Sequence, residues 1–509
     1  MTPQKFVDVA TLPRILAQQR SRGKRIILCH GTFDLMHAGH IRHFQEAKQY
    51  GDVLVVTVTS NMHVNKGPDR PVFDEKIRAS SVAALACVDF VAVNDAPTAI
   101  NVIESIRPDV YVKGGEYENA SDDVTGNITR EANAVRACGG EIRFTHDITF
   151  SSSRLLNEYF GIFPDHTKQF LKSFREEVRG NDFTRRLTDP RPLSACVLGD
   201  AIIDEYCYCI PLGQSGKGNA LSVRYEDNEL FAGGAMAVAN HIAGFVRDVT
   251  LVTGLGRKQS HESFIRGHLR SNVSPVFFYR EDSPTVLKRR YVDQDMTKLF
   301  EVYFYNDCPL PNELERDVLG WIAASLSCYD LVVVPDYGNG FLTAKLAAAI
   351  SSHSRFLAVN TQVNSGNRGH HVITRYPRAD FIALNEPELR LAAHDRHGPL
   401  DLIASRIGKQ LNARSIVVTR GTRGALLVDL EKNQQFPIPA LSTRVVDRVG
   451  AGDALLALAS VFLADGQTPH VAAFVGSCAA ALEVQSVCNR EPVDRIQLAK
   501  YVSTLLKWE

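Results

Sequence analysis

The strongest constraint on the fold is a repeated alternation of short apolar segments with segments of about ten residues that have helical periodicity. Four apolar segments, typical of buried strands, occur in the first third of the chain, at 25–30, 52–60, 88–94 and 109–115. Helical patterns separate them, at 40–50, 74–86 and 98–106. Strands joined by helices of this length pair in parallel through right-handed crossovers. Residues 1–160 are therefore predicted to form an α/β domain around a parallel sheet.

A second series of the same kind starts at Ser194 (SACVLGDAIID) and continues to the C-terminus, which predicts a second α/β domain over residues 191–509. Residues 161–190 are charged and carry no strand pattern, so we expect a helical linker. Between Glu205 and Phe231, and again between Val276 and Tyr305, apolar residues alternate without intervening helices. These two pieces are predicted to form a small antiparallel lid beside the main sheet.

Charge and composition exclude some classes of protein. The chain of 509 residues has 57 basic and 57 acidic side chains, a balance that argues against a protein that coats nucleic acid. It contains no run of about 18 apolar residues and no apolar signal segment, so we expect no membrane association. Its ten cysteines lack paired CxxC spacing, which is typical of reduced thiols in a cytoplasmic protein.

The first chemical motif is HGTFDLMHAGH, residues 30–40, where a strand leads into a helix. Gly31 permits close approach of the backbone to a ligand, and the helix N-terminus attracts an anion. His37 and His40 are three residues apart and so lie on one helical face. Two imidazoles there can bind a triphosphate and neutralise charge that develops on its α-phosphorus. The alternative is that both are ordinary surface or core histidines.

This motif, together with VKGGEY at 112–117 and FSSS at 150–153, resembles the nucleotidyltransferase superfamily of cytidylyltransferases and heptose-phosphate adenylyltransferases. In that family a phosphomonoester attacks the α-phosphate of a nucleoside triphosphate, and pyrophosphate leaves. The resemblance implies that His37, His40 and Lys113 are catalytic. It implies that the nucleotide is bound by Gly31, Thr32, Phe33, Asp34, Lys66, Arg78, Ser151, Ser152 and Ser153. The sequence THDITFSSS lacks the arginine-containing signature of glycerol-phosphate cytidylyltransferases, which favours the adenylyltransferase branch, although ATP and CTP both stay open.

The second motif is DRVGAGDA, residues 447–454, between a β-rich stretch and a long apolar helix. Its glycine-flanked loop and the helix N-terminus direct successive amides at one point, which suits a phosphoryl group in transfer. Asp453 on the first helical turn can accept the proton of an attacking hydroxyl. The alternative is that Asp453 only caps the helix.

The second motif resembles the signature of the ribokinase (PfkB-type) sugar kinases. The resemblance implies sugar-binding residues Asp200, Asp204, Gly233 and Gly234, and Asp453 as the catalytic base. It implies nucleotide and phosphate contacts from Asn385, Glu388, Thr419, Gly421, Gly450, Ala451 and Gly452, with Glu388 holding Mg²⁺ indirectly.

Two departures from that family and one pair of arginines bear on which sugar or sugar phosphate the kinase block would bind. Ala237 stands where an asparagine is common, and Asn240 substitutes for it only if the helix shifts by almost a turn. Asn339 replaces the lysine of the DYGKG element of heptose-phosphate kinases. Arg289 and Arg290 in the lid are candidates to contact a sugar phosphate, the alternative being an exposed strand face.

Taken together, the two blocks resemble the bifunctional heptose-phosphate kinase/adenylyltransferases, in reversed domain order. The resemblance implies a Rossmann-like nucleotidyltransferase domain followed by a ribokinase-like α/β domain with a small β lid. It implies a homodimer that uses Mg²⁺ and ATP, with ATP or CTP at the transferase site, and makes a nucleotide-activated sugar from a sugar or polyol phosphate. One alternative is a CTP-dependent cytidylyltransferase for a polyol phosphate. A second alternative makes the kinase block a non-catalytic binding or dimerisation module.

Overall fold

The computed structural model describes residues 5–64, 70–118, 127–145, 163–189, 192–367 and 369–506. Its contacts divide the chain into two compact units, Met1–Lys172 with Ala499–Glu509, and Ser173–Leu498. Within the described residues, no helix has the length and apolar character needed to cross a membrane.

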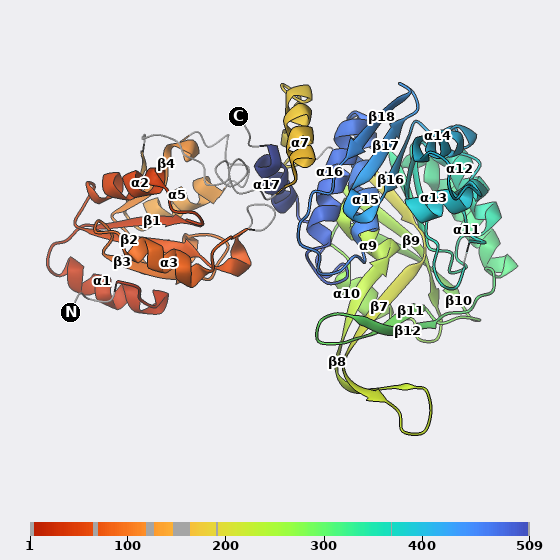
Figure 1. The fold of residues 1–509 in the computed structure, drawn as a ribbon, viewed down its shortest axis with the longest axis horizontal. Helices are drawn as coiled ribbons and strands as arrows, with labels where there is room; N and C mark the ends of the chain where they lie inside the picture. Colours follow the sequence, from red (N-terminus) through yellow and green to blue (C-terminus); the bar gives the residue numbers. More distant parts are fainter. Residues whose placement is uncertain are drawn as a thin grey trace. The chain divides into compact units, whose positions relative to one another are not determined.

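The first unit is built on a five-stranded sheet in the order β3-β2-β1-β4-β5, and every neighbouring pair is parallel (Figure 1). The predicted parallel α/β fold of this region is confirmed. The strands are β1 (Ile26–Gly31), β2 (Val53–Thr59), β3 (Phe90–Asn94), β4 (Val110–Gly114) and β5 (Glu141–Thr145). The helices are α1 (Leu12–Arg20), α2 (Ala38–Lys48), α3 (Glu75–Ala83), α4 (Ile100–Ile106) and α5 (Asn127–Ala137).

Alternate residues of the central strands serve two cores, because successive side chains of a strand point to opposite faces. On one face, Ile27 and Cys29 of β1 pack with Phe44 of α2 and with α3. On the other face, Ile26 and Leu28 pack with α1, α4 and α5. The apolar runs of these strands therefore reflect burial on both sides, which leaves the carboxyl ends of the strands for function.

The second unit is built on a nine-stranded sheet in the order β10-β9-β6-β13-β14-β15-β16-β17-β18. The pairs are parallel as far as β16, and β17 and β18 add antiparallel strands at one edge. The strands are β6 (Ser194–Leu198), β9 (Asp248–Gly256), β10 (Val273–Arg280), β13 (Leu331–Asp336), β14 (Leu357–Thr361), β15 (Phe381–Asn385), β16 (Ser415–Thr419), β17 (Ala425–Asp429) and β18 (Gln434–Ile438). The helices are α9 (Ala235–Ala243), α10 (Glu262–His268), α11 (Asn312–Ser325), α12 (Ala344–His353), α13 (Glu386–Ala392), α14 (Leu400–Gln410), α15 (Ala451–Ala464) and α16 (Pro469–Glu483). The helix α17 (Arg495–Leu506) ends the described chain.

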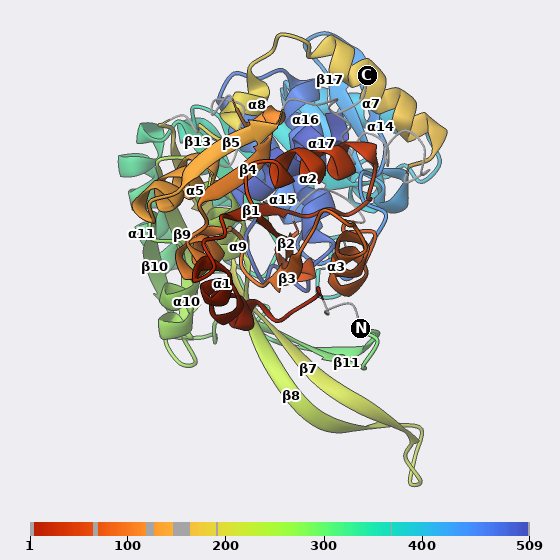
Figure 2. The same ribbon diagram turned by 90° about the vertical axis from the view of Figure 1, so that its left-hand side faces the viewer.

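A four-stranded sheet in the order β12-β11-β7-β8 forms the predicted lid. Its strands are β7 (Ala201–Gln214), β8 (Leu221–Gly234), β11 (Val286–Val292) and β12 (Lys298–Phe304). The long hairpin of β7 and β8 projects from the rest of the second unit in both Figure 1 and Figure 2.

Two details of the predicted lid are wrong. The lid is not wholly antiparallel, because its central pair, β7 and β11, is parallel. These strands are not joined by a hairpin: the chain passes through β9 and β10 of the main sheet before it returns to the lid in the same direction. Val276 was expected in the lid but lies in β10 of the main sheet.

The charged segment between the two series is helical, as expected, with α7 (Asp165–Glu177) and α8 (Phe183–Arg186). Its described residues, 163–189, contain no strand. Phe174 and Phe183 are buried, and the ring of Phe174 packs on those of His470 and Phe474 in α16. The second half of this segment is thus packed into the second unit rather than being a free tether.

Candidate active sites

In the first unit, the junction of β1 and α2 brings the two motif histidines together. His37 is the N-cap of α2 and His40 lies on its first turn. Their rings are stacked, with centroids 3.9 Å apart and planes at 21°. Both side chains are half-buried, and the pair stands at the carboxyl end of the central strand of a parallel sheet, where α/β folds bind ligands.

Phe33 shapes the loop between β1 and α2. It adopts a left-handed backbone conformation with φ 49°, and its ring meets the edge of His40 at 5.3 Å. A Cβ atom on residue 31 would lie 2.9 Å from the Phe33 ring, so the ring can occupy this place only because residue 31 is glycine. Gly31 therefore has a packing role, beside the expected close approach to a ligand.

Lys113 lies at the end of β4, which pairs with β1. Its Nζ is 3.1 Å from Glu131 Oε2 and 3.5 Å from the carbonyl oxygen of His30. Burial on its own would raise the pKa of Glu131, but the charge of Lys113 together with hydrogen bonds from Ala99 and Tyr111 holds the pKa below its ordinary value. The ammonium group thus reaches the motif strand while it is paired with a buried carboxylate.

Asp34 and Arg78 brace the loops around this site. The carboxylate of Asp34 accepts hydrogen bonds from the amides of Val72 and Phe73 at 2.9 and 3.0 Å. Arg78 is buried and donates to the carbonyl oxygens of Thr32 and Phe73 at 2.6 and 2.8 Å. These contacts hold the loop after β1 against the start of α3.

Four of the expected nucleotide contacts, Lys66, Ser151, Ser152 and Ser153, lie outside the described residues. One further histidine was not singled out from the sequence. His43, a turn after His40, hydrogen-bonds Thr145 at 2.8 Å, and burial lowers its pKa to about 4. Its spacing of three from His40 was the available signal.

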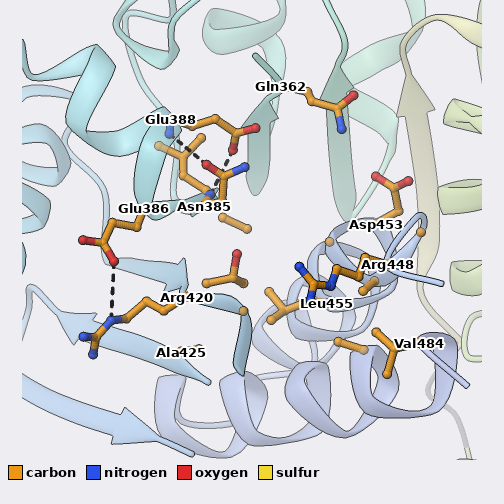
Figure 3. Close-up of a pocket in the computed structure, with 18 of the residues that line it drawn as sticks. Gln362, Asn385, Glu386, Glu388, Arg420, Ala425, Arg448, Asp453, Leu455 and Val484 are labelled. Atoms are coloured by element: carbon orange, nitrogen blue, oxygen red, sulfur yellow. Dashed lines mark hydrogen bonds and ion pairs between the residues drawn. The ribbon is translucent and has the colours of Figure 1, made fainter. Parts of the chain in front are cut away.

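In the second unit, a cavity of about 1450 Å³ opens between the main sheet, the lid and the start of α15. Figure 3 shows Asp453 on one side of this cavity and Asn385 with Glu388 on the other. Gln362 and Arg448 also line it. The volume exceeds what one drug-sized ligand needs and is large enough for two substrates side by side.

Asp453 faces this cavity from the first turn of α15. Tyr337 donates a hydrogen bond to its Oδ1 at 2.7 Å, and the N-cap of the helix is Gly450, with no side-chain cap. The pKa of Asp453 is raised to about 7: burial contributes most and the charge of Asp204 adds to the shift, whereas Tyr337 and Lys288 oppose it. Asp453 is therefore not a simple capping residue: it is poised to exchange a proton near neutral pH.

The loop before α15 requires glycine at residue 450. Gly450 has φ 92°, and a Cβ atom there would lie 2.2 Å from Asn489 Oδ1. Gly450, Ala451 and Gly452 all line the cavity, and Ala451 begins the helix. The start of a helix with unpaired amides at a cavity wall is suited to bind a phosphoryl group.

Asn385 and Glu388 form a capping box at the start of α13. Asn385 Oδ1 accepts the amide of Glu388 at 2.8 Å, and Glu388 Oε2 accepts the amide of Asn385 at 2.9 Å. Burial raises the pKa of Glu388 to about 7. The parallel register of β15 and β16 sets Asn385 beside Thr419, and Gly421 follows in the cavity wall. The expected nucleotide residues thus lie together at the carboxyl ends of two neighbouring strands.

Of the expected sugar-binding residues, Asp204 and Gly234 line the cavity. Asp204 forms an ion pair with Arg290. A Cβ atom on Gly233 would lie 1.9 Å from Asp204 Oδ2, so this carboxylate can be placed here only next to a glycine. Asp200 is buried, and its carboxylate accepts the backbone amides of Asn339 and Phe341 at 3.2 Å each. It holds the loop after β13.

Alternation along β11 separates the two lid arginines. Arg290 lines the cavity with Lys288, while Arg289 lies on the opposite face of the sheet, where it pairs with Glu205 at 2.6 Å. Of the two arginines, only Arg290 is placed to meet a substrate. Lys288 was not singled out from the sequence, although its spacing of two from Arg290 was the available signal.

The two departures from the kinase pattern have distinct surroundings. Asn240 donates to the carbonyl oxygen of His268 at 2.8 Å and accepts the amide of Arg270 at 3.0 Å, so it is engaged away from the cavity and does not substitute for Ala237. Asn339 is buried, and in the described part of the chain its Nδ2 has no hydrogen-bond acceptor. Across the described ranges, no group of three or more His, Cys, Asp or Glu side chains is arranged to hold a metal ion directly.

Comparison with protein families agrees with this division. The model for pfkB family carbohydrate kinases matches residues 193–495, more than half of the chain. The chain belongs to the pfkB family of carbohydrate kinases. The cytidylyltransferase-like model matches residues 28–177, which include the stacked histidines.

Curated relatives match part of the chain. The bifunctional protein HldE of Citrifermentans bemidjiense is 36% identical over 157 residues, 30% of this chain and 31% of that protein. The bifunctional protein HldE of Geobacter metallireducens is 38% identical over 152 residues, 30% of this chain and 29% of that protein. The alignments thus span about a third of the length of these relatives.

Solved structures show the fold of the kinase unit. A ribokinase from Thermotoga maritima superposes with a TM-score of 0.50 at 18% identity and covers 61% of this chain and 99% of its own. Phosphofructokinase-2 from Escherichia coli, in complex with potassium, superposes with a TM-score of 0.50 at 17% identity and covers 62% of this chain and 99% of its own. The predicted ribokinase-like fold is confirmed.

Proposed function

We propose that the chain is a bifunctional enzyme that makes a nucleotide-activated sugar. Its second unit phosphorylates a sugar or sugar phosphate with ATP, and its first unit transfers a nucleotidyl group from a nucleoside triphosphate to a sugar phosphate, releasing pyrophosphate. The observation that carries this proposal is that the residues of two motifs of different chemistry come together, one motif in each unit. One is the stacked pair His37 and His40, and the other is Asp453 at its glycine-flanked loop.

In the kinase reaction, Asp453 accepts the proton of the attacking hydroxyl, and its raised pKa matches a base that works near pH 7. The amides at Gly450–Gly452 bind the γ-phosphoryl group during transfer. Asn385 and Thr419 bind the nucleotide on the opposite wall. Tyr337 holds the carboxylate of Asp453 in one orientation through its hydrogen bond.

In the transferase reaction, His37 and His40 stabilise the charge that develops on the α-phosphate, and Lys113 adds positive charge at the edge of the same sheet. Ser151–Ser153 stay predictions for contacts to the leaving pyrophosphate, and Lys66 stays a predicted charge partner beside Lys113. The chemistry needs no covalent intermediate, because positioning and charge neutralisation account for most of the catalysis of phosphoryl and nucleotidyl transfer.

Magnesium fits the kinase cavity as a hydrated ion. Both carboxylate oxygens of Glu388 already accept backbone amides, from Asn385 and from Val363, so the side chain is suited to hold the ion through its water shell rather than directly. Mg²⁺ keeps several waters in most protein sites. When bound, it neutralises the charge of the nucleotide phosphates.

The acceptor substrate that we favour is a heptose phosphate, and the nucleotide that we favour at both sites is ATP. The product would then resemble ADP-heptose. The similarity to proteins named bifunctional protein HldE supports this choice. A CTP-dependent transfer to a polyol phosphate is the alternative. A non-catalytic role for the kinase unit is disfavoured, because Asp453 faces a large cavity in which the nucleotide residues also meet.

We also propose a cytoplasmic homodimer. All ten cysteines are free thiols, which a reducing compartment favours. The outward face of the lid exposes Phe300, Val302 and Phe304, and a second copy of the sheet would cover these side chains. Light scattering of the purified protein tests the dimer, and a monomer at micromolar concentration contradicts it.

The decisive experiment incubates the purified chain with sugar phosphates, ATP or CTP, and Mg²⁺, and identifies the products by mass. We expect both a phosphorylated sugar and a nucleotide-linked sugar with release of pyrophosphate. Pyrophosphate release from CTP but not from ATP selects the cytidylyltransferase alternative. If nucleotidyl transfer occurs but no phosphorylated sugar forms, the result selects the alternative in which the kinase unit is non-catalytic.

A further inference from the structure

Glu131 of α5 is a buried carboxylate that the proposed transferase reaction does not yet use. Its side chain accepts two hydrogen bonds, from the amide of Ala99 at 3.0 Å and from the hydroxyl of Tyr111 at 2.8 Å. Its Oε2 atom also lies 3.1 Å from the ammonium nitrogen of Lys113. Partners from β4 and from the N-cap of α4 thus fix the carboxylate in one place.

Lys113 is held by further neighbours besides this carboxylate. Its Nζ atom donates to the carbonyl oxygen of His30 at 3.5 Å and lies 5.3 Å from the ring centroids of both Tyr111 and Tyr117. Aromatic faces attract a cation and restrict its position. A free lysine side chain has many rotamers, and a ligand that binds it must remove that entropy. The ammonium is instead pre-organised at the carboxyl end of β4.

The ammonium is still accessible to a ligand. The side chain of Lys113 is 12% exposed, whereas that of Glu131 is 4% exposed. An ammonium has three N–H donors, and within the described ranges this one has a hydrogen bond to His30 and an ion pair with Glu131. At least one donor therefore remains for a phosphate oxygen. The register of β1 and β4 sets Lys113 beside His30, where the motif of the two stacked histidines begins.

Glu131 has a structural alternative, because it also closes the start of α4 through the amide of Ala99. A neutral side chain would fill that role without the cost of burying a charge. Burial raises the pKa of Glu131, but Lys113 and the hydrogen-bond donors lower it by more, so the carboxylate is ionised at neutral pH. The retained charge is therefore matched to the ammonium and not to the helix.

We propose that Glu131 is a positioning residue, which holds the ammonium of Lys113 in the orientation in which it meets a phosphate group of the nucleoside triphosphate. This inference rests on the proposed transferase function, to which it adds a residue that acts through another. Glu131 does not touch the nucleotide itself. Its effect on nucleotide binding and on transfer therefore depends on the presence of the lysine.

The test is a double-mutant cycle in the full chain. Glu131→Gln keeps the shape of the side chain and removes its charge, and Lys113→Met removes the ammonium. Calorimetric titration with the α,β-methylene analogues of ATP and CTP, in the presence of Mg²⁺, measures nucleotide binding, and pyrophosphate release measures transfer. The binding phase that changes in Lys113→Met belongs to the transferase site, and the other phase is an internal reference. Glu104→Gln, the same chemical change at an exposed position of α4, is the matched control.

We expect Lys113→Met to weaken binding of an analogue and to lower kcat/KM for transfer by roughly 10- to 100-fold, the loss of one charge-assisted contact. Glu131→Gln should lower both by about tenfold, because a misplaced cation keeps part of its attraction. In the Lys113→Met background, Glu131→Gln should change neither by more than about twofold. The double variant should also unfold at a higher denaturant concentration than Lys113→Met alone, which leaves a buried carboxylate without its cation.

Three results overturn the inference: analogue binding that does not depend on Lys113, a folded Glu131→Gln variant that binds and transfers as the wild type does, or losses that multiply in the double variant. The last result would assign the carboxylate to the fold alone. Normal transfer with any of these results leaves the proposed function intact. Analogue binding that shows the expected coupling, without pyrophosphate release from any acceptor, would support the inference and refute the proposed transferase activity.

A second variant covers the case in which Glu131→Gln does not fold. Tyr111→Phe removes one donor to the carboxylate and leaves its charge in place. We expect it to lower analogue binding and transfer by about threefold, and to have no effect in the Lys113→Met background. A loss of the same size in both backgrounds would contradict the inference. Chemical unfolding of each variant separates loss of binding from loss of fold.

Discussion

In the proposed reactions, the two candidate sites would handle a nucleoside triphosphate by opposite means. The first presents a pair of half-buried imidazoles at a strand–helix junction, with a neighbouring cation, Lys113, that is paired with a buried carboxylate. The second encloses a carboxylate, Asp453, in a large cavity where burial raises its pKa to about 7. The difference follows from the chemistry, since nucleotidyl transfer to a phosphate needs charge neutralisation, whereas phosphorylation of a hydroxyl also needs a base.

The largest expected effect is the loss of kinase turnover when the proposed catalytic base, Asp453, is replaced. The variant Asp453→Asn should lower kinase turnover by about 10³-fold, because the amide cannot accept the proton of the acceptor hydroxyl. Nucleotidyl transfer by the same protein should be unchanged. Coupled assays of ADP and of pyrophosphate release measure both activities in one preparation, and a loss of both in a folded variant would contradict two independent sites.

Replacing either motif histidine should have a nearly equal effect on nucleotidyl transfer. His37→Ala and His40→Ala are each expected to lower nucleotidyl transfer by about 10²- to 10³-fold, because each removes a donor to the α-phosphate. The kinase activity of these variants should be that of the wild type. Gln45→Ala, at an exposed position of the same helix, is the matched control. A transferase that tolerates both histidine changes would refute the role of the imidazole pair.

A smaller change concerns the orientation of the base. Kinase kcat/KM should rise with pH through about 7, as Asp453 loses its proton. Tyr337→Phe removes the hydrogen bond that favours the carboxylate, so kcat should fall by about tenfold and the rise should move to higher pH. The pH profile of nucleotidyl transfer is the internal reference and should not move. An unshifted kinase profile would show that Tyr337 has only a packing role.

The smallest effect is on stability. Asp453 has a pKa in the folded chain above its ordinary value, so folding favours its protonated form, and the stability that it contributes is lost as pH rises from about 4 to about 7. Asp453→Asn removes this dependence and should stabilise the protein at pH 8 by about 1–3 kcal/mol relative to the wild type. Chemical unfolding at pH 5 and pH 8 measures the difference. A stability difference that is equal at both pH values would contradict the raised pKa.

The fold was largely predictable because its signals are local. The strand at 25–30 and the helix at 40–50 show their periods within a dozen residues, and the structure places β1 and α2 there. The parallel pairing of β7 with β11 could not be predicted in the same way. These strands are about eighty residues apart, and their register depends on the route of the chain through the main sheet.

The candidate sites show the same contrast between local signals and contacts of residues far apart in the sequence. The glycine-flanked loop at Asp453 and the spacing of His37 and His40 are short motifs, and the structure brings each set together. The partners of Asp200 and Arg78 lie on other elements, so their role in holding loops was not visible in the sequence. Lys288 was missed for a related reason, because its place in the cavity wall depends on the pairing of β11 with β7.

The capping box at Asn385 and Glu388 has a consequence for how the family is surveyed. These two side chains stabilise the start of α13 by hydrogen bonds that do not involve a nucleotide. Selection for folding alone is thus sufficient to retain them after a kinase has lost its activity. A survey of the family that relies on this pair alone therefore cannot separate active from inactive members. The proposed base, Asp453, is the better marker, because its described hydrogen bond is to Tyr337 and not to the helix backbone.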